Sequence, residues 1–215
     1  DNYTFGGIMN SELIRNDFPI LKTKVGGHQI VYFDNAATTQ RPLPVVNAVL
    51  DYTTHENGNP HRGAHIFAIS ASEAYDTSKE VVRDFIHARS EKEIIYTRNT
   101  SESLNLVARS YGETHLKAGD HILITIAEHH SNLVTWQRVA QKTGATLDYI
   151  YVDKETGHFP EEELKKIDDP RVKLFAFAEV SNVLGIDFDP KPLIQRAHAH
   201  GAIVVLDGAQ STPHK

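Results

Sequence analysis

The stretch VKLFAFA, residues 172–178, is an apolar run interrupted by a single lysine. A near-continuous run of this kind is typical of a strand buried on both faces of a parallel sheet, because a strand with one wet face alternates apolar and polar residues. The next segments support the same interpretation. KPLIQRAHAHG, residues 191–201, has helical spacing and ends in glycine, and AIVVL, residues 202–206, is a second apolar strand.

The same alternation extends toward the N-terminus. Further strands are expected at residues 93–97, 121–126 and 147–152, and helices at residues 101–116, 131–142 and 160–167. This order predicts an α/β fold, with a mostly parallel sheet and helices on both of its faces. Residues 26–42 are less regular and are expected to form a hairpin or an arm that leads into a helix over residues 43–55.

Bulk composition excludes several classes of function. The 215 residues suffice for one large domain or somewhat more, with a real core. The net charge of -6 argues against a nucleic-acid partner or an anionic membrane surface. No apolar run is long enough to span a membrane, and residues 1–10 lack the features of a secretory signal. A cytoplasmic protein is therefore expected.

Cysteine is absent, which removes disulfides, thiolate metal sites and a cysteine nucleophile from these residues. Thirteen histidines are present, and pairs such as His61/His65 could suggest a metal. Only this pair has the i,i+4 spacing that places two imidazoles on one helix face, and no HExxH pattern accompanies it. Surface or hydrogen-bonded histidines are the simpler interpretation, so no metal site is predicted.

Polar residues gather directly after four of the expected strands. The segments are RNTSES (98–103), AEHHSN (127–132), EVSNVLG (179–185) and DGAQS (207–211). Ligands of open α/β sheets bind beyond the carboxyl ends of the strands. The convergence of hydroxyls, imidazoles, amides and a carboxylate therefore predicts a ligand site at this edge.

Each of these clusters has a plainer alternative. Thr100 or Ser101 could simply cap a helix, although the free N–H groups and hydroxyls of a helix start would also hold a phosphate. Asp207 could be a turn residue, since Asp-Gly is a turn dipeptide. At the end of a buried strand, however, a carboxylate is costly unless a cation, such as a protonated pyridine nitrogen, pairs with it.

Two more candidates are ambiguous in the same way. Asn182 could be an ordinary loop amide. His129 could be an ordinary loop histidine, or a flat ring that lies on an aromatic cofactor and moves a proton.

Together the motifs resemble a known family. They are YFDNAATT (32–39), NPHRGAH (59–65), YTRNTSESLNLVA (96–108), AEHHSNLVTWQ (127–137), VSNVLG (180–185) and VVLDGAQS (204–211). In this order they resemble the SufS-type cysteine desulfurases, which belong to the fold-type-I, class V aminotransferase-like enzymes that use pyridoxal 5'-phosphate. The resemblance runs from about Phe18 to the end of the chain. It implies that residues 51–215 are part of the large cofactor-binding domain of a fold-type-I transferase, here truncated.

The resemblance also implies roles for single residues. Thr100 and Ser101 match the pair that holds the cofactor phosphate, and His129 matches the residue stacked on the pyridine ring, which is also an acid/base group. Asp207 matches the carboxylate paired with the pyridinium nitrogen. Two amides match contacts to the phenolic oxygen of the cofactor, namely Asn182 and Gln210.

The implied reaction removes sulfur from L-cysteine and leaves L-alanine. An enzyme cysteine, as thiolate, attacks the substrate sulfur and becomes a persulfide, which passes its sulfur to an acceptor protein for iron–sulfur cluster assembly. The family forms homodimers. Residues 9–50 would then be an N-terminal arm and helix contributing to the small domain. Residues 1–8 are expected to be a foreign remnant, because Met9 is the only methionine and NSELIRNDFPIL reads naturally after it.

Several departures from the family bear on activity. The lysine that forms the internal Schiff base lies well beyond the aspartate in the family, whereas Lys215 follows Asp207 by only eight residues and is not expected to be that lysine. The nucleophilic cysteine and the arginine that binds the substrate carboxylate belong to a later part of the family's chains. Ile186 stands where threonine is usual. The isolated 215 residues are therefore expected to be inactive.

Two other functions stay open. Selenocysteine lyase, kynureninase or a class V aminotransferase would share the cofactor contacts. A non-catalytic fragment or interaction module would explain the lack of cysteine and of the Schiff-base lysine.

Overall fold

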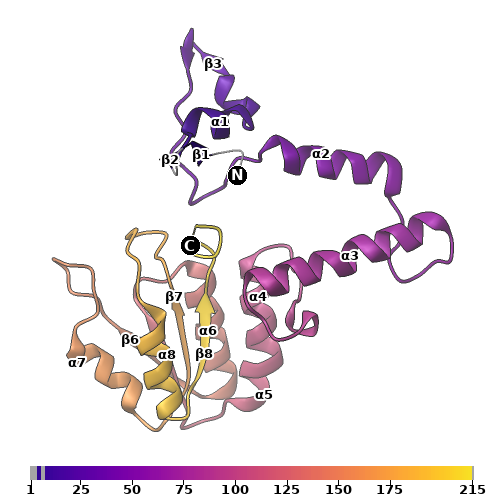
Figure 1. Ribbon diagram of the computed structural model, residues 1–215. Coiled ribbons are helices and arrows are strands. Elements are labelled where there is room, and N and C mark those ends of the chain that lie inside the picture. The colour runs from indigo at the N-terminus through magenta and orange to yellow at the C-terminus, as the bar shows by residue number, and fades with distance from the viewer. Residues whose placement is uncertain (1–3, 6–7, 215) are drawn as a thin grey trace. The chain divides into compact units, whose positions relative to one another are not determined.

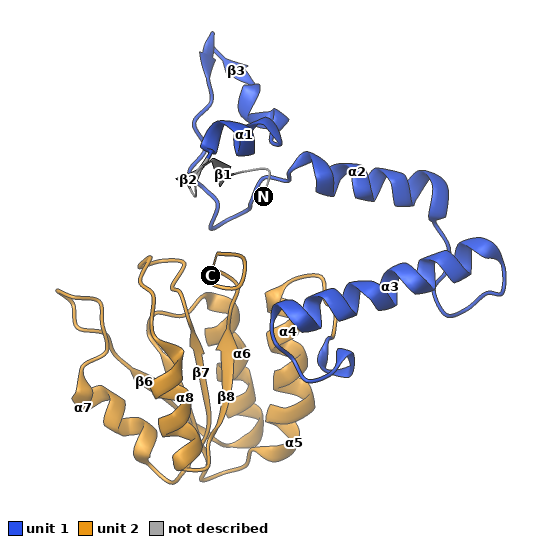
Figure 2. Cartoon of the chain, in the orientation of Figure 1, with its two compact units in different colours: residues 1–94 blue, residues 95–215 orange. Residues whose placement is uncertain are grey.

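The computed structural model describes residues 4–5 and 8–214. The chain divides into two compact units, residues 1–94 and residues 95–215 (Figure 2). The foreign remnant predicted for residues 1–8 falls largely outside the described residues, and so does Lys215.

The first unit consists of helices and short hairpins. Its elements are β1 (Thr4–Phe5), β2 (Ile8–Met9), α1 (Ser11–Asn16), η1 (Pro19–Lys22), β3 (Lys24–Val25), β4 (His28–Gln29), α2 (Leu43–Asp51), η2 (Tyr52–Glu56), α3 (Ile66–Phe85) and η3 (Glu91–Glu93). Strands β3 and β4 pair antiparallel around Gly26 and Gly27, both with positive φ. The helix after residue 42 is confirmed. The hairpin covers only the start of the expected range, because residues 30–42 contain no strand, and α3 was not predicted.

His61 and His65 do not share a helix face, although their spacing in the sequence would allow it. His61 does not lie on a helix, because its φ of 60° belongs to a turn and its ring faces Asp76 at 3.4 Å. His65 is the N-cap of α3 and accepts the N–H of Ala68 at 3.3 Å. In the part of the chain that the structure describes, no group of three or more acidic or histidine side chains is arranged to bind a metal.

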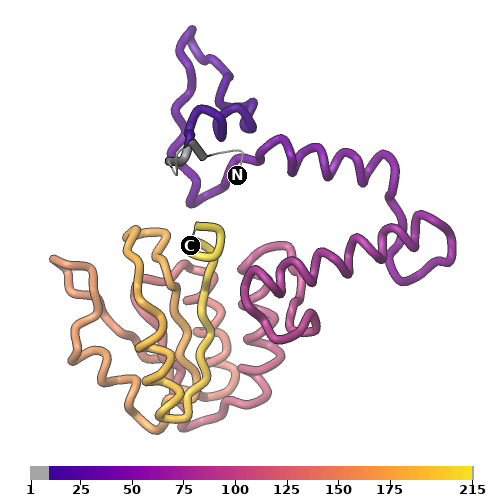
Figure 3. Tube along the Cα trace, viewed as in Figure 1, coloured from indigo at the N-terminus to yellow at the C-terminus, as the bar shows by residue number. Residues whose placement is uncertain are grey.

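The second unit carries the sheet (Figure 1). Its elements are α4 (Thr100–Val107), η4 (Ala108–Gly112), α5 (Glu113–His115), β5 (His121–Thr125), α6 (His130–Thr143), β6 (Thr146–Ile150), α7 (Glu161–Leu164), η5 (Lys165–Asp168), β7 (Val172–Ala178), α8 (Pro190–Ala199) and β8 (Ile203–Asp207). The strand order is β6-β5-β7-β8, and every pair is parallel. Figure 3 traces the helical crossovers that parallel pairing requires.

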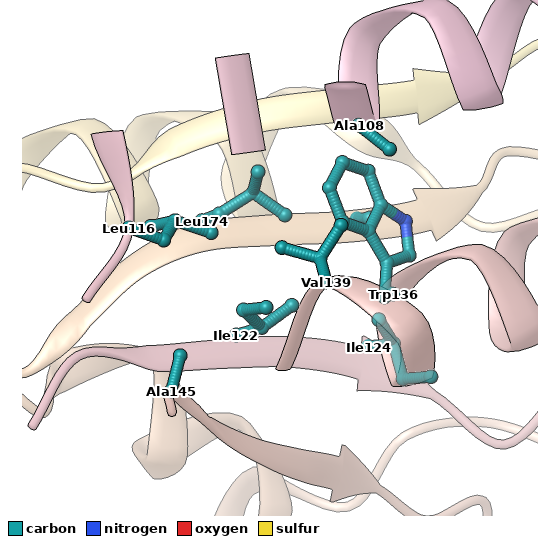
Figure 4. Packing of buried hydrophobic residues seen from close by; sticks show 9 residues of the cluster. Ala108, Leu116, Ile122, Ile124, Trp136, Val139, Ala145 and Leu174 are labelled. Carbon is teal, nitrogen blue, oxygen red and sulfur yellow. The ribbon is translucent and has the colours of Figure 1, made fainter. Parts of the chain in front are cut away.

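Two apolar cores cover the two faces of this sheet. On one face Ile122, Ile124 and Leu174 pack with Trp136 and Val139 of α6 (Figure 4). On the other face Leu123, Phe175 and Phe177 pack with residues of η5 and α8, namely Ile167, Leu193 and Ala197. Alternate residues of one strand enter opposite cores, which is why β7 is apolar almost throughout. The prediction of a parallel sheet with helices on both faces is confirmed.

Helix ends follow local sequence signals. Gly144, with φ 76°, ends α6, as predicted from its position. Asp189 caps α8 by accepting the N–H of Lys191 at 3.1 Å, and Pro190 occupies the first helical position. Where a helix begins and ends sets the length of the crossover, and therefore the position of the last residue of the next strand.

The predicted strand at residues 93–97 is wrong. Residues 94–97 are not assigned to any strand, although Ile94 has an extended backbone with φ −91° and ψ 117°. A strand exists only where a neighbour supplies hydrogen-bond partners. Among the described residues the sheet runs from β6 to β8 and offers this segment no partner.

Within residues 4–5 and 8–214, none of the helices combines the length and the apolar character that crossing a membrane requires.

Candidate functional site

The start of α4 presents unpaired backbone donors. Asn99 is the N-cap, and its Oδ1 accepts the N–H of Glu102 at 3.0 Å. The idea that Thr100 or Ser101 caps this helix is therefore wrong; they are its first two residues. Their backbone N–H groups lie in the first turn, where the helix provides no carbonyl to accept them, so this end favours an anion.

Thr100 and Asp207 line the same cavity, which has a volume of about 420 Å³. Its wall combines the first turns of α4 with the end of β8 and the loop that follows, including Gly208, Ala209 and Thr212. A helix start that favours anions and a carboxylate thus face one cavity of a size typical of ligand sites.

Asp207 is the last residue of β8 and is buried. Its Oδ1 accepts the N–H of Ala209 at 3.0 Å, and its carbonyl accepts the N–H of Glu179 at 3.1 Å. No ion pair to this carboxylate occurs within the described residues. Nearby in sequence, the Ser211 hydroxyl is buried and has no hydrogen-bond partner within the same residues.

His129 is joined to the start of α4 through a residue that the sequence did not single out. His129 is the N-cap of α6, and its Nδ1 accepts the N–H of Ser131 at 3.1 Å. The Ser131 hydroxyl lies 2.9 Å from that nitrogen and 2.5 Å from the hydroxyl of Ser101. The structure therefore brings Ser101 and His129 together, with Ser131 between them.

Glu128 is a second residue that sequence reasoning missed. Its carboxylate is buried and accepts hydrogen bonds from Thr125 Oγ1, from the N–H of Ala178 at 3.1 Å and from Asn132 Nδ2 at 2.6 Å. The pKa of Glu128 is raised to about 7, and burial is the largest cause; the hydrogen bonds oppose the shift, and the charge of Asp207 acts in the same direction as burial. A glutamate in a loop is normally exposed to solvent. The available signal was the spacing of four residues from Glu128, just before α6, to Asn132 and again to Trp136 on that helix.

Asn182 and Gln210 are less closely joined to this group. Asn182 is exposed, and no hydrogen bond of its side chain links it to the other candidates within the described residues. Its loop is anchored by Ser181, whose buried hydroxyl donates to the carbonyl of Ala127 at 2.9 Å. Gln210 is half-buried in the turn after β8. Both therefore lie at the same sheet edge as the other candidates.

The chemistry of these donors fits pyridoxal 5'-phosphate. The helix start and the hydroxyls of Thr100 and Ser101 suit a dianionic phosphate. Asp207 is a buried carboxylate that lacks a cation of its own among the described residues, which suits a pyridinium nitrogen.

The second unit is a parallel α/β domain with a cavity at the carboxyl ends of its strands, where ligands of such sheets bind. Residues 31–215 match the model of the aminotransferase class-V family, and the chain belongs to that family.

Its homologues are named as cysteine desulfurases. A "Probable cysteine desulfurase" of Halalkalibacterium halodurans is 46% identical over 206 residues, which are 96% of this chain and 50% of that protein. Among solved structures, the apo cysteine desulfurase of Thermococcus onnurineus has a TM-score of 0.85 at 40% identity, covering 95% of this chain and 48% of that chain. The cysteine desulfurase CsdA of Escherichia coli has a TM-score of 0.80 at 33% identity, covering 96% and 50%. The chain spans about half the length of these relatives.

Proposed function

We propose that this chain carries the cofactor-binding residues of a pyridoxal 5'-phosphate-dependent cysteine desulfurase of the SufS type. The enzyme would convert L-cysteine to L-alanine and keep the sulfur as a persulfide for iron–sulfur cluster assembly. The observation that carries the proposal is the cavity that Thr100 and Asp207 share at the carboxyl edge of the sheet. The named activity of the homologues supports it.

Each candidate residue has a role in this proposal. Thr100 and Ser101 bind the phosphate, and Asp207 holds the ring nitrogen in its protonated form. When bound, the cofactor withdraws electrons from the α-carbon of the amino acid. Asn182 and Gln210 bind the phenolic oxygen.

His129 stacks on the ring and moves a proton. Because its Nδ1 accepts the backbone N–H of Ser131, the proton of the neutral ring is on Nε2. Nε2 is then the atom through which His129 exchanges protons with a bound amino acid.

The nucleophile must come from outside these residues, because the 215 residues contain no cysteine. We therefore expect the isolated 215-residue polypeptide to bind the cofactor weakly and to release no sulfide from L-cysteine. The lysine that holds the cofactor is also assigned elsewhere, and Lys215 is not assigned to that role. A stable cofactor absorbance lost in a Lys215→Ala variant would contradict this assignment.

The domain division, oligomeric state, localisation and partners of the enzyme are proposed on the same basis. Residues 9–50 contribute to a small domain and residues 51–215 to the cofactor domain; this division differs from the boundary after residue 94 found in the structure. The working enzyme is a cytoplasmic homodimer that delivers sulfur to an acceptor protein. No nucleic acid, membrane or metal takes part.

Selenocysteine lyase or another class V enzyme is the second candidate, because it would share every residue assigned above. Comparing L-cysteine with L-selenocysteine as substrates of the full-length protein distinguishes the two. A non-catalytic module is the third candidate, and it has no use for the cofactor.

A cofactor titration tests the proposal. The dissociation constant of pyridoxal 5'-phosphate should rise at least about tenfold in Thr100→Val and in Asp207→Asn, since each loses a charge-assisted contact. Ser110→Ala is the matched control, because its exposed hydroxyl donates only to the carbonyl of Leu106 on the same helical stretch. Equal affinity in all four proteins would refute the proposed site, and no affinity in any would favour the non-catalytic module.

A further inference from the structure

Glu128 connects three elements at the point where the site is assembled. One carboxylate oxygen, Oε1, accepts from Thr125 at the end of β5 and from the N–H of Ala178 at the end of β7. The other, Oε2, accepts from Asn132 in the first turn of α6 at 2.6 Å. Two strand ends and a helix start are thus tied to one side chain, which directly precedes His129.

The same network reaches into the core. Asn132 Oδ1 accepts the indole N–H of Trp136 at 2.7 Å, and both side chains are fully buried. Trp136 packs with Val139 and Ala108 in the core under α6 (Figure 4). A network whose polar groups are all paired is rigid, because every alternative arrangement leaves a buried group unpaired.

Two consecutive residues of the chain join this network to Asp207. The N–H of Ala178 donates to Glu128, and the N–H of Glu179 donates to the carbonyl of Asp207 at 3.1 Å. The end of β7 is therefore bound to Glu128 through Ala178 and to the end of β8 through Glu179. These two hydrogen bonds connect the residue before His129 with Asp207.

We propose that Glu128 is a positioning residue of the proposed cofactor site: it holds the start of α6, and with it His129, through Asn132 and Trp136, and it holds Asp207 through the end of β7 at Ala178 and Glu179. This inference rests on the proposed function, because it names what holds the same site in shape.

The hydrogen-bond pattern explains why a carboxylate stands here. A glutamine at position 128 could still accept from Thr125 and Ala178, but its Nε2 would face Asn132 Nδ2, donor against donor. Turning the Asn132 amide removes that conflict and creates another, because its Nδ2 then faces the indole N–H of Trp136. With an amide at both positions, no arrangement of the two side chains satisfies every donor.

A second substitution, at position 132, should restore the hydrogen bonds that E128Q loses. In Glu128→Gln with Asn132→Asp, the new carboxylate accepts from both the glutamine Nε2 and the indole N–H, so every hydrogen bond returns. The negative charge has moved from position 128 to position 132. The double variant thus separates the hydrogen-bond pattern from the charge at position 128.

The experiment compares the full chain with E128Q, E128Q/N132D and Val139→Ala. Val139 is buried beside Trp136 and makes no side-chain hydrogen bond, so its truncation is a control for loss of stability alone. Unfolding, Trp136 fluorescence, the ¹⁵N shifts of the His129 ring and the affinity for pyridoxal 5'-phosphate are measured for each above about pH 8, where Glu128 is a carboxylate. E128Q should weaken affinity at least about tenfold and shift the His129 signals, Val139→Ala should do neither, and the double variant should return both to within about threefold of the original.

Three results would overturn the proposal. One is E128Q with unchanged His129 signals and affinity. Another is Val139→Ala with the same losses as E128Q. The third is a double variant that regains stability but not the His129 signals, or that does not fold. If the original chain binds no cofactor, the proposed function fails, whereas the His129 signals still decide whether Glu128 positions that ring.

Discussion

Ser101 and Ser131, thirty positions apart in the sequence, share a hydrogen bond of 2.5 Å between their hydroxyl oxygens. The first turns of α4 and α6 are thereby joined at the sheet edge. Because Ser131 also contacts Nδ1 of His129, the proposed phosphate site and the proposed acid/base group are parts of one hydrogen-bonded chain.

The tautomer of His129 follows from this chain. The backbone N–H of Ser131 can only donate, so Nδ1 accepts and the neutral ring carries its proton on Nε2. In ¹⁵N spectra recorded at a pH where the ring is neutral, we expect the Nε2–H form. Ser131→Ala keeps the backbone donor and should keep this tautomer. A ring that carries its proton on Nδ1 in either protein would contradict the assignment.

Glu128 should make stability depend on pH. Its pKa is raised from 4.5 to about 7 in the folded chain, so the folded state retains a proton that the unfolded state releases. The free energy of unfolding should therefore fall as the pH rises from about 4.5 to 7, by on the order of 3 kcal/mol, and be insensitive to this group at higher pH.

Denaturant unfolding across this range, in the original chain and in E128Q, isolates the effect because every other ionisable group is the same in both. The difference between the two curves should change with pH in this window. Parallel curves would show that Glu128 does not titrate there.

Much of the second unit could be predicted because its strands have only one way to be buried. The run at residues 172–178, apolar except for Lys173, coincides with β7. Helices cover both faces of the sheet there, so neither face of this strand is open to solvent. The run at residues 93–97 has similar composition and is not a strand, because pairing depends on a neighbour that composition does not reveal. Helix α3 was missed although its twenty residues are amphipathic.

The site was predictable only in part, for a related reason. Strand ends can be located from patterns, and Thr100 and Asp207, which follow two expected strands, line one cavity. Two partners of Glu128, Thr125 and Asn132, are close to it in sequence, but the third, the N–H of Ala178, is fifty residues away. No local pattern indicates that Ala178 joins the other two at this carboxylate.

Gly157 should tolerate alanine less well than Gly201 does. Both have positive φ, 73° and 80°, so alanine is strained at each. A Cβ at Gly157 would clash with Ile186 Cδ1, whereas nothing lies within 4 Å at Gly201. Because Cδ1 is the end of a flexible side chain that can turn aside, we expect Gly157→Ala to cost only up to about 1 kcal/mol more than Gly201→Ala. Ile186→Val removes the offending atom, so adding it to Gly157→Ala should recover the difference, measured by denaturant unfolding and a double-mutant cycle.

The proximity of the two site carboxyls can be measured without any cofactor. The charge of Asp207 is one of the causes that raise the pKa of Glu128, so Asp207→Asn should lower that pKa. The asparagine Oδ1 can still accept the N–H of Ala209, which keeps the turn intact. Carboxyl ¹³C signals of labelled glutamate, followed over pH, report the change.

Asp148→Asn is the control, because that carboxylate contacts His121 at the start of β5, away from this edge. It should leave the titration of Glu128 unchanged. An equal shift in both variants would mean a general effect of net charge, and no shift in Asp207→Asn would mean that the two carboxyls do not interact. A shift confined to Asp207→Asn would mean that the carboxylate at the end of β8 and the one before His129 act on each other across the end of β7.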